Sequence, residues 1–241
     1  MNAVPFISKS KYLSGLQCSK LLWHYCNAKD RIPPPDAALE AIFEQGHAVG
    51  ALAKQLYPDG IEINWDDGFD SGLTPSLELL SFRRPLFEAG FVYKNSYARA
   101  DILVPAPEGK WDIIEVKSTT KVKDVNYHDL ALQRYCYEGA GVRINRCYLI
   151  HLNNQYVRHG AVDPAQLFTK ADVTDMVDEA SPGIEQRLDD MVAVVRSQQC
   201  PEVPIGLQCS NPYDCPLIDM CWSFLPKDNP LSLYRVSKPK A

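Results

Sequence analysis

The hydrophobic positions follow a helical period in some stretches of the chain and form short strand-like runs in others, which predicts a mixed α/β fold. Asp36 is placed to cap a long helix, and the glycines at 139 and 141 are typical helix stops. Residues 105–109 (PAPEG) are typical of a turn between two strands. The predicted helices are 16–25, 37–57, 75–89, 126–138 and 172–198, with a break or fresh start at 181–182, and the predicted strands are 90–97, 98–104, 111–116 and 146–153.

The C-terminal stretch 200–241 shows no such period and is rich in proline and cysteine. We therefore expect something other than a hydrophobic core to hold it. Eight cysteines in 241 residues are the other feature that needs an explanation.

The composition, 46% hydrophobic and 23% charged, is that of an ordinary globular protein and excludes a disordered chain, a collagen and a small disulfide scaffold. A net charge of −5 excludes a generally basic protein that coats nucleic acid. The first residues lack a signal-peptide core, and no apolar run is long enough to span a membrane, so we expect a cytoplasmic protein without a membrane partner. In that reducing compartment, cysteines serve as metal ligands, catalysts or core residues more often than as disulfides.

A candidate site lies on the hairpin predicted around 105–109. With the turn centred near Glu108, Asp101 lies opposite Glu115, and directly opposed side chains point to the same face. Lys117 shares that face because side chains alternate with a period of two. The opposite face is apolar and is predicted to join the core; it comprises Ile102, Val104, Ile114 and Val116.

Two neighbouring carboxylates repel each other unless a cation lies between them, and their oxygen atoms suit Mg²⁺ or Mn²⁺. Such an ion would polarise a phosphoryl oxygen and lower the pKa of a bound water. Lys117 could then orient or deprotonate the water, or neutralise charge on the phosphate. The alternative interpretation is a surface trio of charges without a function.

The pattern Asp101…Glu115-Val116-Lys117 resembles the D…(D/E)-x-K core of the PD-(D/E)XK nuclease superfamily, and more narrowly the RecB-type nucleases. That resemblance extends to His47 on the helix 37–57 and to a Q-x-x-x-Y motif at Gln133 and Tyr137. It implies an α/β nuclease core with a mixed β-sheet flanked by helices. It also implies a metal bound by His47, Asp101, Glu115 and the Val116 carbonyl, a catalytic Lys117, and Gln133 and Tyr137 assisting catalysis by positioning the substrate or the lysine.

The C-terminal stretch contains three evenly spaced cysteines, Cys209, Cys215 and Cys221, which indicate a metal centre. Such a centre needs a fourth ligand, and we choose Cys18 for it. No C-x₂₋₄-C zinc knuckle is present, whereas a [4Fe–4S] cluster tolerates scattered spacings. Cys200 is the alternative to Cys209, and Cys26 the alternative to Cys18. The two remaining cysteines, Cys136 and Cys147, are expected to be buried thiols.

This arrangement resembles RecB-type nucleases with an iron–sulfur cluster, among them the CRISPR-associated Cas-four exonucleases and the AddB-type helicase–nucleases. The resemblance implies a single nuclease domain over 1–241, with its core at about 37–198 and an iron–sulfur lobe from 6–30 and 199–225. It implies cleavage of single-stranded DNA as an exonuclease, with endonuclease activity also compatible, and partners in CRISPR adaptation or DNA repair.

Two other functions remain open. The chain could be a non-catalytic nucleic-acid-binding module, or a zinc-stapled protein whose Asp–Glu–Lys trio is incidental. Contact with nucleic acid would use a strip of basic residues around the trio, comprising Arg83, Arg84, Lys94, Arg99, Lys117, Lys121 and Lys123.

Overall fold

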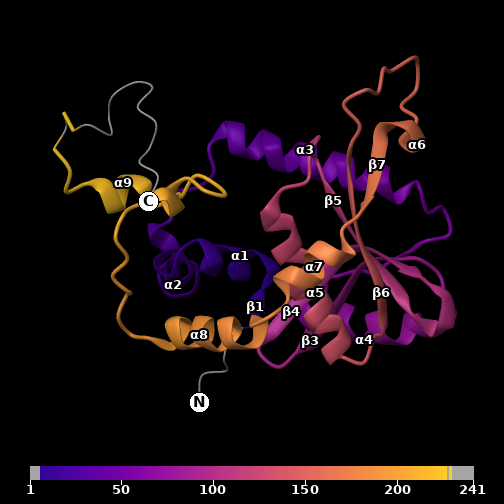
Figure 1. Ribbon diagram of the computed structural model, residues 1–241, viewed down its shortest axis with the longest axis horizontal. Coiled ribbons are helices and arrows are strands. Elements are labelled where there is room, and N and C mark those ends of the chain that lie inside the picture. The colour runs from indigo at the N-terminus through magenta and orange to yellow at the C-terminus, as the bar shows by residue number, and fades with distance from the viewer. Residues whose placement is uncertain (1–5, 227, 230–241) are drawn as a thin grey trace. The chain divides into compact units, whose positions relative to one another are not determined.

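The computed structural model describes residues 6–226, 228 and 229, and these fall into two compact units (Figure 1). The larger unit contains residues 6–9 and Pro35–Glu185. The smaller contains Ser10–Pro34 and the described residues from 186 onward. Like the predicted lobe, the smaller unit combines segments from both ends of the chain, but it also includes 186–198, which we had assigned to the core.

A curled, mixed β-sheet forms the centre of the larger unit, as expected for an α/β fold (Figure 1). In the described part of the chain it has seven strands, in the order β2-β3-β4-β5-β6-β7, with β1 pairing with β4. The β3–β4, β4–β5 and β6–β7 pairs are antiparallel, and the β1–β4, β2–β3 and β5–β6 pairs are parallel. The strands are β1 (Ile7–Ser8), β2 (Ile61–Glu62), β3 (Leu86–Tyr93), β4 (Ser96–Pro105), β5 (Trp111–Lys117), β6 (Ile144–Leu152) and β7 (Phe168–Asp172).

Helices flank this sheet. Ala53 of α3 packs against Ile102 and Ile114 on one face, whereas α5 contributes Gln133, which reaches Glu115 on the other. The expected helix signals are confirmed: Asp36 accepts a hydrogen bond from the Leu39 amide at 2.8 Å, and α5 ends at Gly139. The helices of this unit are α3 (Ala37–Lys54), α4 (Phe69–Leu79), α5 (Asp124–Gly139), α6 (Pro164–Leu167) and α7 (Thr174–Ala180).

The helix predicted at 75–89 is confirmed only up to Phe82: α4 ends at Leu79, a 3₁₀ helix follows to Phe82, and the chain enters β3 at Leu86, where we expected helix. The β3–β4 hairpin closes over Lys94 and Asn95, since Tyr93 pairs with Ser96. Lys94 has a left-handed φ of 50°, a conformation for which lysine gives no sequence signal, so the predicted strand 90–97 ran across the turn.

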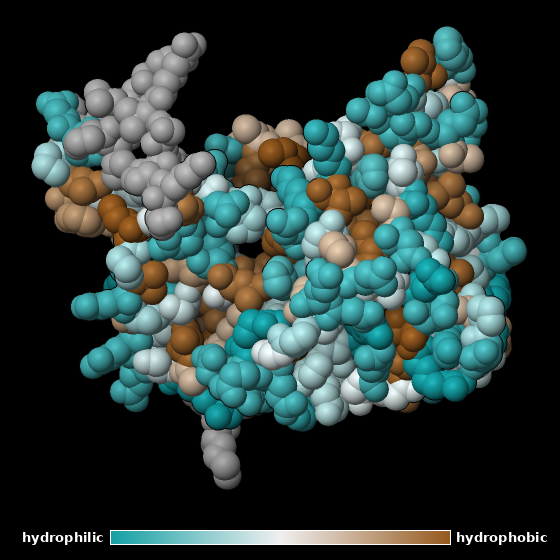
Figure 2. Space-filling view, viewed as in Figure 1, coloured by the Kyte–Doolittle hydropathy of each residue, from teal (hydrophilic) through white to brown (hydrophobic). Residues whose placement is uncertain are grey.

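Helix α3 forms as predicted, but only part of its apolar face is buried. Val49 and Ala53 are buried, whereas Leu39, Ile42 and Phe43 are between 41% and 56% exposed. In Figure 2 brown atoms interrupt the hydrophilic surface over this helix. The helical period therefore predicted the helix correctly, but it did not show that only the C-terminal half of the apolar face is buried.

The smaller unit contains helices from both ends of the chain. The helix predicted at 16–25 is two helices, α1 (Lys9–Gln17) and α2 (Ser19–Asn27), separated by Cys18 in an extended conformation. The predicted break at 181–182 separates α7 from α8 (Ile184–Arg196). The last helix is α9 (Ile218–Trp222), and short 3₁₀ helices occur at Lys29–Arg31, Leu80–Phe82, Pro107–Gly109 and Leu207–Cys209.

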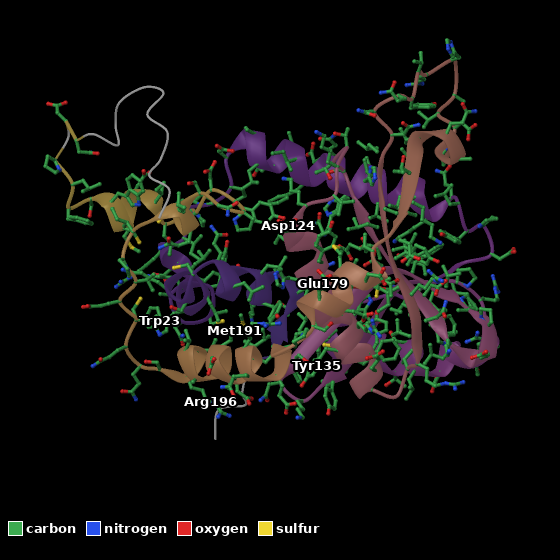
Figure 3. All side chains as sticks on the ribbon, viewed as in Figure 1. Trp23, Asp124, Tyr135, Glu179, Met191 and Arg196 are labelled. Carbon is green, nitrogen blue, oxygen red and sulfur yellow. The ribbon has the colours of Figure 1, made fainter. Side chains whose placement is uncertain are left out.

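Close contacts join α1 and α2 to α8 within this unit. A Cβ atom at Gly15 would lie 2.8 Å from Met191 of α8, so glycine allows the two helices to approach closely. The Trp23 indole of α2 donates to the Ser197 carbonyl at 2.9 Å, one residue beyond Arg196, where α8 ends (Figure 3).

The expectation that 200–241 lacks a hydrophobic core is wrong for the described residues. Cys215 and Leu217 are buried together with Leu21 of α2, and Tyr25 and Ile32 pack against them. Gln17 adds two hydrogen bonds, donating to the carbonyls of Gln208 at 2.7 Å and Tyr213 at 2.8 Å. Residues 230–241 of this stretch lie outside the described part.

Over the described residues, no helix has both the length and the apolar character needed to cross a bilayer.

Candidate functional site

The β4–β5 hairpin has the register that the sequence predicts. Ile102 pairs with Ile114 and Leu103 with Ile113, and the next step of this register sets Asp101 opposite Glu115. Ile102 and Ile114 are fully buried in the core, which leaves Glu115 and Lys117 on the other face of β5. The predicted apolar face is confirmed.

Glu115 is the most heavily hydrogen-bonded group of this site, and it is only 1% exposed. Its Oε1 accepts from Lys117 Nζ at 2.6 Å and from Lys9 Nζ at 2.8 Å, while its Oε2 accepts from Gln133 Nε2 at 2.7 Å. Burial alone would raise the pKa of Glu115, but the charges of Lys117 and Lys9 lower it to about 2. The carboxylate is therefore ionised at neutral pH.

Asp101 is less well compensated. Its Oδ2 accepts a hydrogen bond from the Val116 amide at 2.7 Å, yet burial and the neighbouring charge of Glu115 raise its pKa to about 7. Two lysines near the pair lower this pKa without restoring it to its ordinary value. Asp101 therefore holds a proton more readily than Glu115 does.

Lys117 bridges two carboxylates, because its Nζ also lies 2.9 Å from Asp129 Oδ2. Burial would lower the pKa of Lys117, but Glu115, Asp129 and Asp101 raise it well above its ordinary value. The side chain is held as an ammonium group.

Two residues of this cluster escaped the sequence prediction. Asp129, one turn before Gln133 on α5, is 1% exposed and accepts from both Lys117 and Gln133. Its spacing of four residues from Gln133 is a usable sequence signal. Lys9 gave no such signal, because 106 residues separate it from Glu115.

Gln133 and Tyr137 lie one turn apart on α5, as predicted, but both act inside the protein. Gln133 is fully buried and bridges Glu115 and Asp129. The Tyr137 hydroxyl is also fully buried; it donates to the Ala89 carbonyl and accepts from the Ala100 amide at 2.9 Å. Both side chains are bonded to protein groups in this structure, and the assisting role that the resemblance implies for them stays a prediction.

The two remaining predicted metal ligands are His47 and the Val116 carbonyl, and the structure does not group His47 with the carboxylates. His47 is exposed on α3. Among the residues that the structure describes, no three His, Cys, Asp or Glu side chains are grouped so that they could hold one metal ion. Val116 enters the site through its amide group, and its carbonyl and His47 remain predicted ligands.

The four cysteines chosen from the sequence line one pocket of the smaller unit. Cys18 precedes α2, Cys209 ends a 3₁₀ turn, and Cys221 lies on α9. The Cys215 amide donates to the Cys209 carbonyl at 2.9 Å, which fixes these two positions relative to each other. Burial raises the pKa of the Cys215 thiol, and its three cysteine neighbours also raise it.

The other cysteines are outside this pocket lining. The Cys200 Sγ atom lies 3.7 Å from Nε2 of the buried His24 ring. Cys136 and Cys147 are fully buried, as expected, and burial raises the pKa of each to about 12. Cys26 is half-buried on α2.

Most of the predicted basic strip is engaged within the protein. Arg83 donates to two backbone carbonyls and stacks on Trp111, and Arg84 donates to the Asp59 carbonyl. Lys94 pairs with Glu185, and Arg99 with Glu88. These four side chains therefore already bind backbone carbonyls, an aromatic ring or carboxylates of the protein.

Comparisons with known proteins add little. No family model matches the chain, and no curated protein matches it. Its fold is similar to that in the crystal structure of SSO0001, with a TM-score of 0.45 and 11% sequence identity over 94% of this chain and 90% of that chain. A similarity of this size is too weak to carry an argument about function.

Proposed function

We propose that the chain is a metal-dependent nuclease whose reaction centre comprises Asp101, Glu115 and Lys117. The observation that carries the proposal is a pair of opposed carboxylates, of which Glu115 is buried and Asp101 partly buried, with the lysine of the motif bonded to Glu115. Three carboxylates, Asp101, Glu115 and Asp129, share this cluster with only two lysines, Lys9 and Lys117, and burial together with the charge of Glu115 raises the pKa of Asp101 to about 7.

The donor set fits a divalent cation that prefers oxygen ligands. Asp101 and Glu115 would hold it. The Val116 carbonyl and His47 are the further ligands that the resemblance implies, and His47 lies on α3, whose Ala53 packs against the face of the sheet opposite Glu115. Gln133 Oε1 is a buried acceptor without a hydrogen-bond partner among the described residues. A cation or a further donor beside Glu115 could supply this missing partner. When bound, the ion would polarise a phosphoryl oxygen and acidify a coordinated water.

The side chains around the carboxylates have distinct roles in this proposal. Lys117 is held as an ammonium group, so it would stabilise negative charge on the phosphate and would not act as the base. Gln133 orients Glu115 by its hydrogen bond to Oε2. Single-stranded DNA as the substrate follows from the resemblance to the RecB-type nucleases.

The decisive experiment measures cleavage of end-labelled single-stranded DNA in Mn²⁺ by the full chain and by the Lys117→Met and Glu115→Gln variants. We expect the wild-type chain to cleave and both variants to lose at least about a hundredfold, the scale typical of a removed electrostatic stabiliser. Lys54→Met is the matched control, because Lys54 is 23% exposed and pairs with Glu62 and Glu88 elsewhere in the same unit.

Two results would contradict this proposal. Cleavage by either site variant at the wild-type rate would separate the activity from this site. Binding of the oligonucleotide without any cleavage, in Mg²⁺ and in Mn²⁺, would favour the non-catalytic binding module.

We also propose that Cys18, Cys209, Cys215 and Cys221 bind a [4Fe–4S] cluster. The support is a single pocket lined by all four, in which most other lining side chains are apolar: Val203, Pro204, Ile205, Leu217 and Ile218. Four cysteine thiolates are the usual ligand set of a [4Fe–4S] cluster. The cluster would tie α2 to the C-terminal stretch.

Metal analysis of anaerobically purified protein tests this second part. Iron together with acid-labile sulfide is expected in the wild-type chain and in Cys26→Ser, and is expected to be lost in Cys215→Ser. One equivalent of zinc and no sulfide would instead support the zinc-stapled alternative, in which the carboxylate site is incidental.

A further inference from the structure

Lys9 reaches the carboxylate site because of where β1 joins the sheet. β3 occupies one edge of β4 along residues 96–103, so β1, which pairs with Ser96 and Tyr97, uses the other edge. β5 uses that same edge further along β4. Strand β1 therefore ends beside the end of β5 that carries Glu115 and Lys117, and Lys9 follows β1 directly.

The chain holds Lys9 firmly at this position. Ile7 is fully buried, and its amide donates to the Asn95 carbonyl at 2.8 Å. The Lys9 ammonium then lies 2.8 Å from Glu115 Oε1 and 3.8 Å from Asp129 Oδ1. Its side chain is 27% exposed, so the contact lies at the solvent side of the cluster.

Two ammonium groups share one carboxylate oxygen in this arrangement. Lys117 Nζ lies 2.6 Å from the same Glu115 Oε1, although like charges repel at such distances. The other oxygen of Glu115 accepts from Gln133. A cation that binds Glu115 opposite Asp101 would therefore compete for Oε1, the oxygen that both lysines hold.

The two lysines are not held equally. Lys117 has a second short contact, at 2.9 Å to Asp129, whereas the second contact of Lys9 is 3.8 Å long. Lys117 is also part of the seven-residue strand β5, while Lys9 is the first residue of α1 and follows a strand of only two residues. Lys9 is the ammonium group that can leave Glu115 at the lower cost.

We propose that Lys9 is the built-in counter-ion of this site, which occupies Glu115 Oε1 in the metal-free protein and is displaced from it by a divalent cation. This inference rests on the proposed function, because it concerns the same carboxylates. Lys9 is a positioning residue in this role: with Lys117 it compensates the buried carboxylates Glu115 and Asp129, beside the partly buried Asp101, before the metal binds. When displaced, its ammonium group stays near the site, because Lys9 directly follows β1.

Metal affinity tests the inference without a measurement of activity. Isothermal titration of the EDTA-treated full chain with MnCl₂ would compare the wild type with Lys9→Met, Lys9→Arg and the control Lys54→Met. Because a competing positive charge is removed, we expect Lys9→Met to bind Mn²⁺ about three- to tenfold more tightly. Lys9→Arg should remain close to the wild type, since it keeps the charge, and Lys54→Met should not differ from it.

Thermal unfolding provides the second measurement. In EDTA, Lys9→Met should melt below the wild type, because the carboxylates lose a counter-charge, and the rise in melting temperature caused by Mn²⁺ should be larger than in the wild type. If Lys9→Met does not fold, Lys9→Gln replaces it, since glutamine keeps a hydrogen-bond donor without the charge.

The possible failures are distinguishable. Unchanged or weaker Mn²⁺ binding by Lys9→Met, with normal binding by the wild type, would show that Lys9 supports the metal ligands and would overturn the inference alone. If the wild-type chain binds no Mn²⁺, or if Asp101→Asn and Glu115→Gln bind it as well as the wild type does, the proposed metal site itself is wrong and the inference is wrong with it.

Discussion

Replacing Tyr137 by phenylalanine tests whether the second half of the Q-x-x-x-Y motif positions the strands or takes part in the reaction. The Tyr137 hydroxyl is inserted between Ala89 of β3 and Ala100 of β4, which occupy paired positions in the ladder. The adjacent residue Glu88 has a left-handed φ of 58°, so the ladder is irregular at this point. Asp101 follows Ala100 directly, and any closure of the ladder would move its carboxylate.

The expected loss follows from the two backbone groups that the phenol satisfies. Each buried polar group left without a partner costs about 1–3 kcal/mol, so the loss of both bonds should lower the unfolding free energy by about 2–6 kcal/mol. For a chain of this size that corresponds to a melting temperature lower by about 4–24 °C. Tyr135→Phe is the matched control, because Tyr135 is a half-buried tyrosine on the same helix (Figure 3).

Urea unfolding followed by tryptophan fluorescence would measure this difference, and Mn²⁺ titration would report on Asp101. The reasoning would be refuted if Tyr137→Phe unfolded at the same urea concentration as the wild type. That result would mean that β3 and β4 close the gap and bond to each other directly. A large loss of cleavage with unchanged stability would return Tyr137 to the reaction itself.

Three further predictions concern stability. Gln17→Ala should speed proteolysis at 207–215 and cost about 1–2 kcal/mol, because Gln17 donates to two carbonyls of that segment. In EDTA the wild-type unfolding free energy should fall as pH rises from about 4 to about 7. The reason is that Asp101, with its pKa raised to about 7 in the folded chain, keeps a proton that the unfolded chain releases near 3.8. Urea titrations at several pH values should show a flatter slope for Asp101→Asn. Gly90→Ala should cost about 1–3 kcal/mol by the same assay, since a Cβ atom there would lie 2.4 Å from the Trp65 ring.

The hairpin that carries Asp101 and Glu115 was predictable because its information is local. A proline- and glycine-containing turn fixed the register, and the alternation of apolar residues fixed which face is buried. The four cysteines of the pocket could also be chosen from the sequence, although the reason for choosing Cys209 over Cys200 was weak. In the structure Cys209 lines the pocket and Cys200 lies beside His24.

Lys9 and the β3–β4 turn were not predictable for two different reasons. The contact of Lys9 with Glu115 depends on a two-residue strand that pairs with a partner about ninety residues away, and so short a strand has no period to detect. The turn depends on Lys94 in a left-handed conformation that favours glycine or asparagine, so tertiary structure overrides the local preference there.

The arrangement of charges around Glu115 also sets a limit on how well the site can bind a metal. Two buried carboxylates, Glu115 and Asp129, would destabilise the fold without counter-charges, and the two lysines remove most of that cost in the metal-free chain. The same ammonium groups must then compete with the incoming cation for Glu115. Stability of the empty site and affinity for the metal therefore oppose each other, and Lys9, the more weakly held of the two lysines, is the position at which a single substitution can shift the balance.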